Sequence, residues 1–423
     1  MQNSQQSIPK NWAARFFTIW AGQGISLFGS ALVQFALVWW LTQKTGSATV
    51  LALATLVAML PRIILGPFAG ALVDRWNRRL ILIISDGTIA LFSLLLAWLF
   101  ATGKVEIWHI YAIMAVRSLG GAFHFPAMSA STPLLVPNEQ LTRVNGLNQT
   151  LQGINGLVAP PLGALLLGLF QTQAVLLIDV ITAAMAILPL LFISIPQPRR
   201  LEEPTQTEEI SLLEDIRIAI RYIRNWPGLV AVILMALFLN SLLTPTGALM
   251  PLLVTKYFEK GALELGFLQS AQGVGVILGG FILSVWGGFK KKITTTLMGI
   301  IGVGIGVMLL GLAPANYLFV AIIGTAVIGI MMPITNGPLG AILQSVIRPD
   351  MQGRVMSLIN SAASALSPLG LLIAGPISDT LGIRVWFWAG GLIWIITGIA
   401  AFFSPAVTNI EGNQEISPIL ATD

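Results

Sequence analysis

Long apolar segments alternate with short polar segments along almost the whole chain. Each apolar run is long enough to cross the hydrocarbon core of a bilayer, which takes about 20 residues in a helix. The pattern predicts an all-α membrane protein with twelve transmembrane helices. The predicted spans lie near residues 16–41, 48–72, 80–101, 107–127, 145–170, 173–194, 229–255, 264–286, 293–313, 316–340, 356–377 and 385–403.

The composition agrees with this pattern and narrows the possible functions. The chain is 55% apolar and 10% charged, with a mean hydropathy of +0.83, whereas soluble domains carry about 25% charged residues. The chain has no cysteine and two histidines, so we expect no metal site and no cofactor. There is no phosphate-binding loop and no nucleophile–base set, so neither an ATP-driven pump nor an enzyme is predicted. The net charge of +5 is spread along the membrane edges, which argues against a nucleic-acid partner.

The basic residues indicate which side of the membrane each loop occupies. Twelve spans place both termini on one side. Most lysines and arginines fall in the N-terminal segment and in the loops on that same side, as Arg78 and Lys290 do, while few, such as Lys104, fall opposite. Basic loops remain in the cytoplasm. We therefore predict a multi-pass protein of the cell membrane with both termini in the cytoplasm.

Three short patterns recur in the second half of the chain at nearly constant separation, which predicts two homologous six-helix bundles. The clearest are Leu65-Gly66-Pro67-Phe68 with Leu278-Gly279-Gly280-Phe281, and Pro161-Leu162-Gly163 with Pro368-Leu369-Gly370. The domains expected are an N-terminal bundle (1–195), a cytoplasmic linker (196–227), a C-terminal bundle (228–404) and a flexible cytoplasmic tail (405–423). In the linker, Ser211-x-x-Glu214 resembles a helix capping box ahead of an apolar stripe. It predicts an amphipathic helix on the inner membrane surface, or alternatively a helix that binds a partner.

A basic turn between the second and third spans carries the most specific motif. Its residues are Gly66, Gly70, Asp74, Arg75, Arg78 and Arg79. The two glycines share a helix face and predict a close helix contact, while Asp74 is expected near the positive end of the next helix. The motif resembles the signature between the second and third helices of the major facilitator superfamily, with Asn77 in place of one usual glycine. The resemblance implies the two-bundle fold of that family and a gating role for the turn. The second copy has Gly287 opposite Asp74.

Four ionisable residues lie well inside the predicted spans: Arg62, Asp86, Arg117 and Asp179. Charges in lipid are costly unless they are paired or face a cavity. Depth along the helices predicts that Arg117 pairs with Asp179 and Arg62 with Asp86. One hypothesis is that a carboxylate of these pairs exchanges a proton during transport; the alternative is two static ion pairs that fix helix packing.

Two further motifs bear on the direction of transport. Arg117-Ser-Leu-Gly-Gly resembles the fourth-helix motif of facilitator antiporters, where the arginine is tied to proton coupling. The segment with Pro160, Pro161 and Gly163 resembles the fifth-helix motif of exporters. Prolines kink a helix and small residues allow close sliding contact, so a bent packing helix is the alternative.

Gly302-x-Gly304-x-Gly306 lies within an apolar run and is interpreted as close helix packing.

Polar uncharged residues are frequent in the predicted spans and are candidates for a substrate cavity. They are Gln23, Gln34, Gln149, Gln152, Asn155, Asn240, Gln269, Gln272, Asn336 and Asn360. Hydrogen-bonding groups in a mostly apolar cavity suit an amphipathic organic substrate, although hydrogen bonds between helices are the alternative for each residue. His109 and His124 are expected at the two membrane interfaces, at opposite ends of the fourth span.

Three segments resemble the macrolide-efflux branch of the superfamily, and more loosely the enterobactin-exporter group. They are the opening segment from Phe16 to Gln34 and the segments 73–79 and 117–126. The resemblance implies a secondary transporter that exports an amphipathic small molecule, such as a macrolide-like drug, in exchange for protons. The expected partners are this substrate, protons and the lipid bilayer, with a monomer as the functional unit. Alternatives are a siderophore or lipid exporter, an uptake symporter, and a membrane sensor or assembly factor that transports nothing.

Overall fold

In the computed structural model, the described residues are 11–197, 217, 220–347 and 351–411. The regular elements among them are helices, and ten are long and apolar enough to cross a membrane. A further helix, α4 (Ile107–Leu135), is long enough but more polar. The eleventh expected span is broken into α12 (Gln352–Ala365) and α13 (Ser367–Leu381), each too short alone. With these additions the helices match the twelve expected spans, and the prediction of an all-α membrane protein is confirmed.

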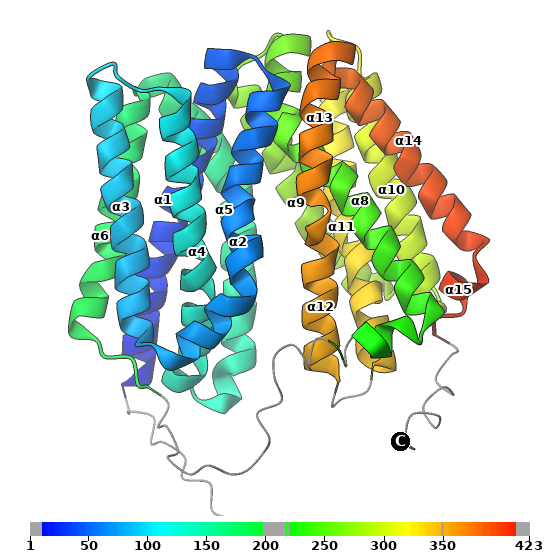
Figure 1. Ribbon diagram of the computed structural model, residues 1–423, viewed down its shortest axis with the longest axis horizontal. Helices are drawn as coiled ribbons and strands as arrows, with labels where there is room; N and C mark the ends of the chain where they lie inside the picture. Colours follow the sequence, from blue (N-terminus) through cyan, green and yellow to red (C-terminus); the bar gives the residue numbers. More distant parts are fainter. Residues whose placement is uncertain (1–10, 198–216, 218–219, 348–350, 412–423) are drawn as a thin grey trace, which may run out of the picture. The chain divides into compact units, whose positions relative to one another are not determined.

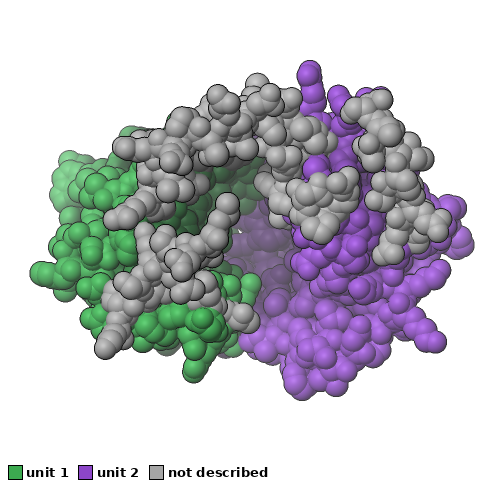
Figure 2. All heavy atoms as spheres, turned by 90° about the horizontal axis from the view of Figure 1, so that it is seen from below, with its two compact units in different colours: residues 1–46, 53–201 green, residues 47–52, 202–423 purple. Residues whose placement is uncertain are grey.

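The chain divides into two compact units (Figure 2). Unit 1 comprises residues 1–46 and 53–201, and unit 2 comprises residues 47–52 and 202–423. The predicted linker largely falls outside the described residues, as does the predicted capping box at Ser211. Residues 220–224 of its second part are helical. Most of the predicted C-terminal tail also falls outside the described residues.

Unit 1 is a bundle of long helices (Figure 1). They are α1 (Trp12–Thr45), α2 (Ala48–Arg75), α3 (Arg78–Ala101), α4, α5 (Leu141–Leu169) and α6 (Thr172–Phe192), with a short 3₁₀ turn, η1 (Asn138–Gln140), before α5. Helix α1 packs against α6, α5 and α4, while α3 packs against α4 and α6. An apolar cluster that includes Phe16, Leu82 and Leu190 joins the starts of α1 and α3 to the end of α6.

Helix α3 illustrates how these helices are patterned. Its exposed stripe is Ile84, Leu91 and Trp98, spaced at seven residues so that they share one face. Its buried side carries Asp86 and Ser93, also seven residues apart. Apolar side chains therefore face the lipid, and polar side chains face the interior of unit 1, because only there do they find hydrogen-bond partners.

Unit 2 is also helical. It contains α8 (Pro227–Leu252), the π-helical turn η2 (Leu253–Tyr257), α9 (Ala262–Trp286), α10 (Lys292–Leu312), α11 (Leu318–Val346), α12, α13, α14 (Ile383–Phe402) and α15 (Pro405–Thr408). Helix α10 packs against α11 and α14, and α11 also packs against α9.

Glycines make these contacts close. A Cβ on Gly304 would lie 2.9 Å from the carbonyl oxygen of Gly391 in α14, and a Cβ on Gly306 would lie 2.7 Å from that of Gly324 in α11. Real Cβ atoms almost never come this near to backbone. The helices can therefore approach only because these residues lack a side chain, and the interpretation of the glycine run as a packing surface is confirmed.

Candidate functional site

Two layers of polar side chains lie inside unit 1. The first, which we call the ion-pair layer, contains Arg117 of α4, Asp179 of α6, Ser30 of α1 and Ser93 of α3. Nη1 of Arg117 lies 2.5 Å from Oδ2 of Asp179. The hydroxyl of Ser30 donates to Oδ1 of Asp179 at 2.9 Å, and that of Ser93 donates to Oδ2 at 2.7 Å. Nη2 of Arg117 donates to the carbonyl of Ser30 at 2.9 Å. Both charges are thus matched and hydrogen-bonded, as burial requires.

The second layer, which we call the histidine layer, contains Gln23 of α1, Asp86 of α3 and His124 of α4. Nε2 of Gln23 donates to Oδ2 of Asp86 at 3.0 Å. Nε2 of His124 lies 2.5 Å from Oε1 of Gln23 and 3.5 Å from Oδ1 of Asp86. The exposed fractions of the three residues are 2%, 5% and 8%. A carboxylate, an amide and an imidazole therefore meet in a nearly dry position.

The two layers follow from a repeat in the sequence. Gln23 and Ser30 are seven residues apart on α1, as are Asp86 and Ser93 on α3 and Arg117 and His124 on α4. Seven residues are two helical turns, so each helix presents one residue to each layer, about 10 Å apart along the axis. Sequence analysis missed Ser30, Ser93 and the inward position of His124. The shared spacing of seven is the signal that could have found them.

The structure joins Arg117 to Asp179 but corrects the other predicted pair. Asp86 is bonded within the histidine layer, and among the described residues Arg62 forms no ion pair with it. Arg62 is exposed, and its guanidinium lies against α4, where a Cβ on Gly121 would be 2.9 Å from Nη2. The prediction of an interfacial His124 was also wrong, because that side chain is buried beside Gln23. His109 does lie at a helix end, where its Nδ1 accepts the backbone N–H of Glu106 at 2.9 Å.

The basic turn between α2 and α3 is fixed by hydrogen bonds to helix ends. Nη1 of Arg78 donates to the carbonyl of Ala130 in α4 at 2.8 Å. Arg79 donates to the carbonyls of Leu190 and Leu191 in the last turn of α6, where carbonyls lack helical partners. Asn77, which replaces the usual glycine, caps α3 by accepting the N–H of Leu80.

Other members of this motif are placed differently from expectation. Among the described residues, a Cβ on Gly66 or Gly70 would meet no atom within 4 Å, so the predicted close helix contact is not seen at either glycine. Arg75 is exposed. Asp74 belongs to the last turn of α2, and its side chain lies outside the description. In the second copy, Gly287 ends α9 in a left-handed conformation with a φ of 74°, which a glycine adopts at little cost.

The fifth-helix motif packs against α1. A Cβ on Gly163 would lie 3.1 Å from the ring of Phe35, and Ala159, one turn earlier, is 1% exposed. Pro160 and Pro161 lie within the same helix, where neither supplies a backbone N–H. Gly163 therefore makes close contact with α1 through Phe35, which is the packing that a small residue allows.

The remaining amide side chains differ in exposure. Gln23 belongs to the buried histidine layer rather than to a free cavity wall. Asn240 is half-buried and donates to the carbonyl of Ala236 in its own helix at 2.9 Å. The half-buried members are Gln34, Asn155, Gln269 and Gln272; the exposed members are Gln149, Gln152 and Asn336. The side chain of Asn360 is not among those that the structure describes.

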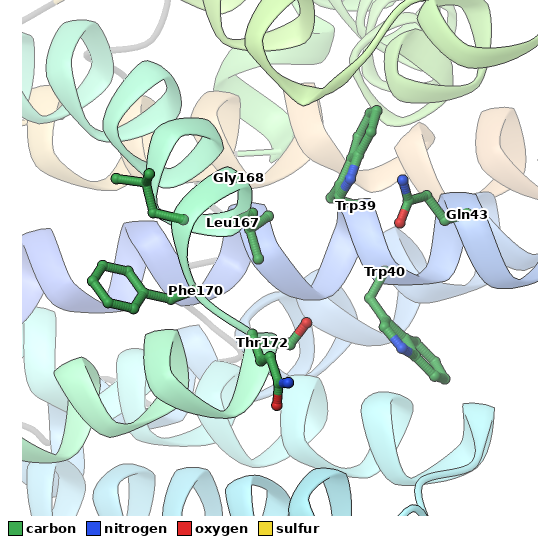
Figure 3. A pocket seen from close by; sticks show the side chains of 9 residues that line it. Trp39, Trp40, Gln43, Leu167, Gly168, Phe170 and Thr172 are labelled. Atoms are coloured by element: carbon green, nitrogen blue, oxygen red, sulfur yellow. The ribbon is translucent and has the colours of Figure 1, made fainter.

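One pocket of about 430 Å³ opens at the ends of α1 and α5 (Figure 3). Trp39, Trp40 and Gln43 line it from α1, and residues 167–172 line it from the end of α5 and the start of α6. The two indoles leave α1 in different directions, and Trp40 packs edge-on against Phe100. Tryptophans at a helix end are typical of the membrane interface. The pocket holds no titratable side chain.

Comparisons with known proteins identify the family to which this chain belongs. Residues 19–371 match the Major Facilitator Superfamily model. Macrolide efflux protein A of Streptococcus pyogenes is 34% identical over 92% of this chain and 95% of its own length. Multidrug efflux pump Tap of Mycolicibacterium fortuitum is 28% identical over 93% and 95%.

Solved structures agree on the fold. A POT family transporter in complex with 5-aminolevulinic acid superposes with a TM-score of 0.71 at 14% identity, over 95% of this chain and 97% of that one. The D-xylose-proton symporter gives 0.68 at 15% identity, over 94% and 99%. This protein is a transporter of the Major Facilitator Superfamily, related to macrolide and multidrug efflux pumps.

Proposed function

We propose that this transporter exports amphipathic small molecules of the macrolide type in exchange for protons, by alternating access. The observation that carries the proposal is the 34% identity with a macrolide efflux protein along 92% of the chain. A multidrug pump is similar over a comparable length. Both relatives are named as efflux proteins, which favours export over uptake.

The polar layers of unit 1 support proton coupling. An ion gradient is the energy source left to a chain without a phosphate-binding loop. Carboxylates inside a membrane protein are expensive to hold charged and commonly mark proton or ion pathways. Asp86 and Asp179 are such groups, each within reach of residues on neighbouring helices.

Contacts within unit 1 offer a route from these layers to the exporter motif. Helix α1 supplies Gln23 and Ser30 to the layers. The same helix packs on α5 where Phe35 meets Gly163. A change of charge in either layer would therefore alter the contact of α1 with α5, the helix that contains Pro160 and Pro161.

Drug susceptibility tests the proposal directly. A pump-deficient bacterium that expresses the chain should tolerate more erythromycin than the empty strain, and a protonophore should abolish the difference in erythromycin accumulation. The protein must be detected in the membrane by an epitope tag. Unchanged susceptibility to erythromycin and to a panel of cationic dyes, despite normal membrane levels, would contradict export of this substrate class.

Inside-out vesicles separate export from uptake. An exporter in exchange for protons concentrates erythromycin inside vesicles whose interior is acidic, whereas an uptake symporter does not. A sensor or assembly factor would move no compound in either direction. We further propose that the functional unit is a monomer with both termini in the cytoplasm.

A further inference from the structure

We infer that the histidine layer, Asp86 with Gln23 and His124, is where the exchanged proton binds, and that the ion-pair layer is structural. The inference rests on the proposed proton coupling and names the residues that carry it. It departs from the sequence motif, which directs attention to Arg117.

The charges of the two layers differ in one respect. In the ion-pair layer, one guanidinium meets one carboxylate at 2.5 Å, and two serine hydroxyls complete the carboxylate's hydrogen bonds. Its net charge is zero without any exchangeable proton. The histidine layer has a carboxylate and an imidazole, so its charge is −1 with neutral His124 and zero after one proton is gained. Burial disfavours net charge. The dry layer is therefore expected to hold that proton and to release it when the transporter opens the layer to water.

Gln23 can bridge the layer in either proton state. As placed, its amide N–H donates to Asp86 and its carbonyl accepts from Nε2–H of His124. A proton added at Nδ1 of His124 gives an imidazolium, with the carboxylate 3.5 Å from its Nε2. If the proton instead resides on Asp86, a half-turn of the amide lets the carboxyl O–H donate to Gln23 and Gln23 donate to neutral His124. In each state Gln23 keeps a hydrogen bond to both Asp86 and His124, which holds the buried network together.

The charged groups around the layer are few among the described residues. Asp179 of α6 acts on Asp86 electrostatically, and Arg117 lies two turns from His124 on α4 but is neutralised by Asp179. Arg62 of α2 reaches α4 near Gly121, one turn from His124, with an exposed side chain. Helix α1 contributes only the neutral Gln23. Among the described residues, His124 is thus the group within ion-pair distance of Asp86 that becomes cationic when it gains a proton.

The position of Gln23 connects the layer to α5. Gly24, the next residue, packs against Leu151, because a Cβ there would lie 3.0 Å from that side chain. One turn before Gln23, the indole N–H of Trp20 donates to Oδ1 of Asn148 at 2.7 Å. Any movement of Gln23 on protonation is therefore expected to move the adjacent residues of α1 that contact α5.

The test uses the full-length transporter in two assays with erythromycin as the probe. In energised inside-out vesicles, erythromycin should release protons from the acidic interior, measured with a fluorescent pH indicator. In proteoliposomes without a pH gradient, labelled erythromycin should exchange with unlabelled erythromycin. We expect Asp86→Asn and His124→Gln to lose the proton signal and keep the exchange. Asp86→Glu, which retains an ionisable carboxyl, should regain part of the proton signal.

The chain supplies matched controls. His109→Gln changes the other histidine, and Glu264→Gln changes a carboxylate at the start of α9; both should keep the proton signal. If Asp86→Asn and His124→Gln also keep it, the inference is wrong while the proposed function stands. If the unmodified protein shows neither proton release nor exchange, the proposed function fails with this probe.

An infrared measurement does not depend on the cargo or on a variant being active. Difference spectra of the purified protein between acid and alkaline buffer should contain the C=O band of a buried carboxylic acid if Asp86 holds the proton, or the ring band of an imidazolium if His124 holds it. That band should shift in Asp86→Glu and in His124→Gln, and stay unchanged in His109→Gln. A band that ignores both changes in the histidine layer would overturn the inference.

Discussion

At the scale of single residues, the protein holds charge in its membrane interior by completing the hydrogen bonds of each charged group. Asp179 is 0% exposed and accepts from Ser30, Ser93 and Arg117, which come from three different helices. Hydrogen bonds to a charged group are stronger than neutral ones. The serines are therefore as much part of the ion pair as the arginine is.

We predict that Ser93→Ala destabilises the protein by about 1.5–3 kcal/mol, because Asp179 loses a charge-assisted hydrogen bond. Ser131→Ala is the matched control. Both serines are 0% exposed, but Ser131 donates only to the carbonyl of Ala127 in its own helix. Thermal unfolding in detergent, followed by tryptophan fluorescence, compares the two. Equal shifts in Tm would show that Ser93 contributes nothing through the carboxylate.

Removing one charge of the ion-pair layer should cost far more than removing both. Arg117→Met leaves Asp179 as an unmatched buried charge, at a cost of about 3–5 kcal/mol. The double variant Arg117→Met with Asp179→Leu should recover most of that loss. The same unfolding assay completes the double-mutant cycle. A double variant no more stable than the single one would contradict a structural role for the pair.

The composition of these layers was only partly predictable. Equal depth correctly predicted that Arg117 and Asp179 meet, but the same reasoning failed for Arg62 and Asp86. Depth counts residues along a helix and says nothing about which face they occupy. The spacing of seven between Arg117 and His124 does indicate the face, since it puts both residues on the inner face of α4.

At the scale of helices, the start of α2 is held by a residue far away in the sequence. Residues 47–52 cluster with unit 2, although the rest of α2 belongs to unit 1. There the carboxylate of Asp379 in α13 accepts the backbone N–H groups of Ala48 and Thr49 at 2.8 and 2.9 Å, and the hydroxyls of Ser47 and Thr49. A carboxylate at this end of a helix satisfies free N–H groups and complements the dipole. No local sequence signal reveals a cap separated by this distance in the chain.

Asp379→Asn should loosen the first turn of α2. Loss of the carboxylate cap is expected to cost about 1 kcal/mol, so the amides of Ala48 and Thr49 should exchange hydrogen about fivefold faster. Hydrogen exchange followed by mass spectrometry measures this. Thr380→Ala, which alters a neighbour bonded only within α13, is the control. Unaltered exchange in Asp379→Asn would mean that water caps the helix equally well.

The contact between α1 and α5 should tolerate little added volume at Gly163. Valine there must displace the ring of Phe35, and such overpacking costs about 1–3 kcal/mol. Gly156→Val adds the same side chain to the same helix where a Cβ meets no atom within 4 Å, so it should unfold nearly at the parent temperature. If the two valine variants unfold alike, the small residues of α5 do not define its contact with α1.

At the scale of the whole molecule, the apolar pattern predicted the helices well because lipid admits little else. A backbone in hydrocarbon must satisfy its own hydrogen bonds, so long apolar runs become helices. The internal repeat predicts two homologous bundles, yet its two copies differ locally. Asp74 lies in the last turn of α2, whereas Gly287 adopts a left-handed conformation that ends α9. Such a difference depends on turn geometry, which apolar periodicity does not encode.

Orientation is the property of the whole molecule that the basic residues predict. Lysines and arginines cluster at the turns expected in the cytoplasm, and moving them across the membrane is opposed by the positive-inside bias. The chain contains no cysteine, so single cysteines can be introduced without background. A cysteine in place of Lys290 should react with a membrane-impermeant maleimide only after the cells are permeabilised. A cysteine in place of Lys104 should react in intact cells. The reverse pattern would place both termini outside the cytoplasm and contradict the predicted orientation.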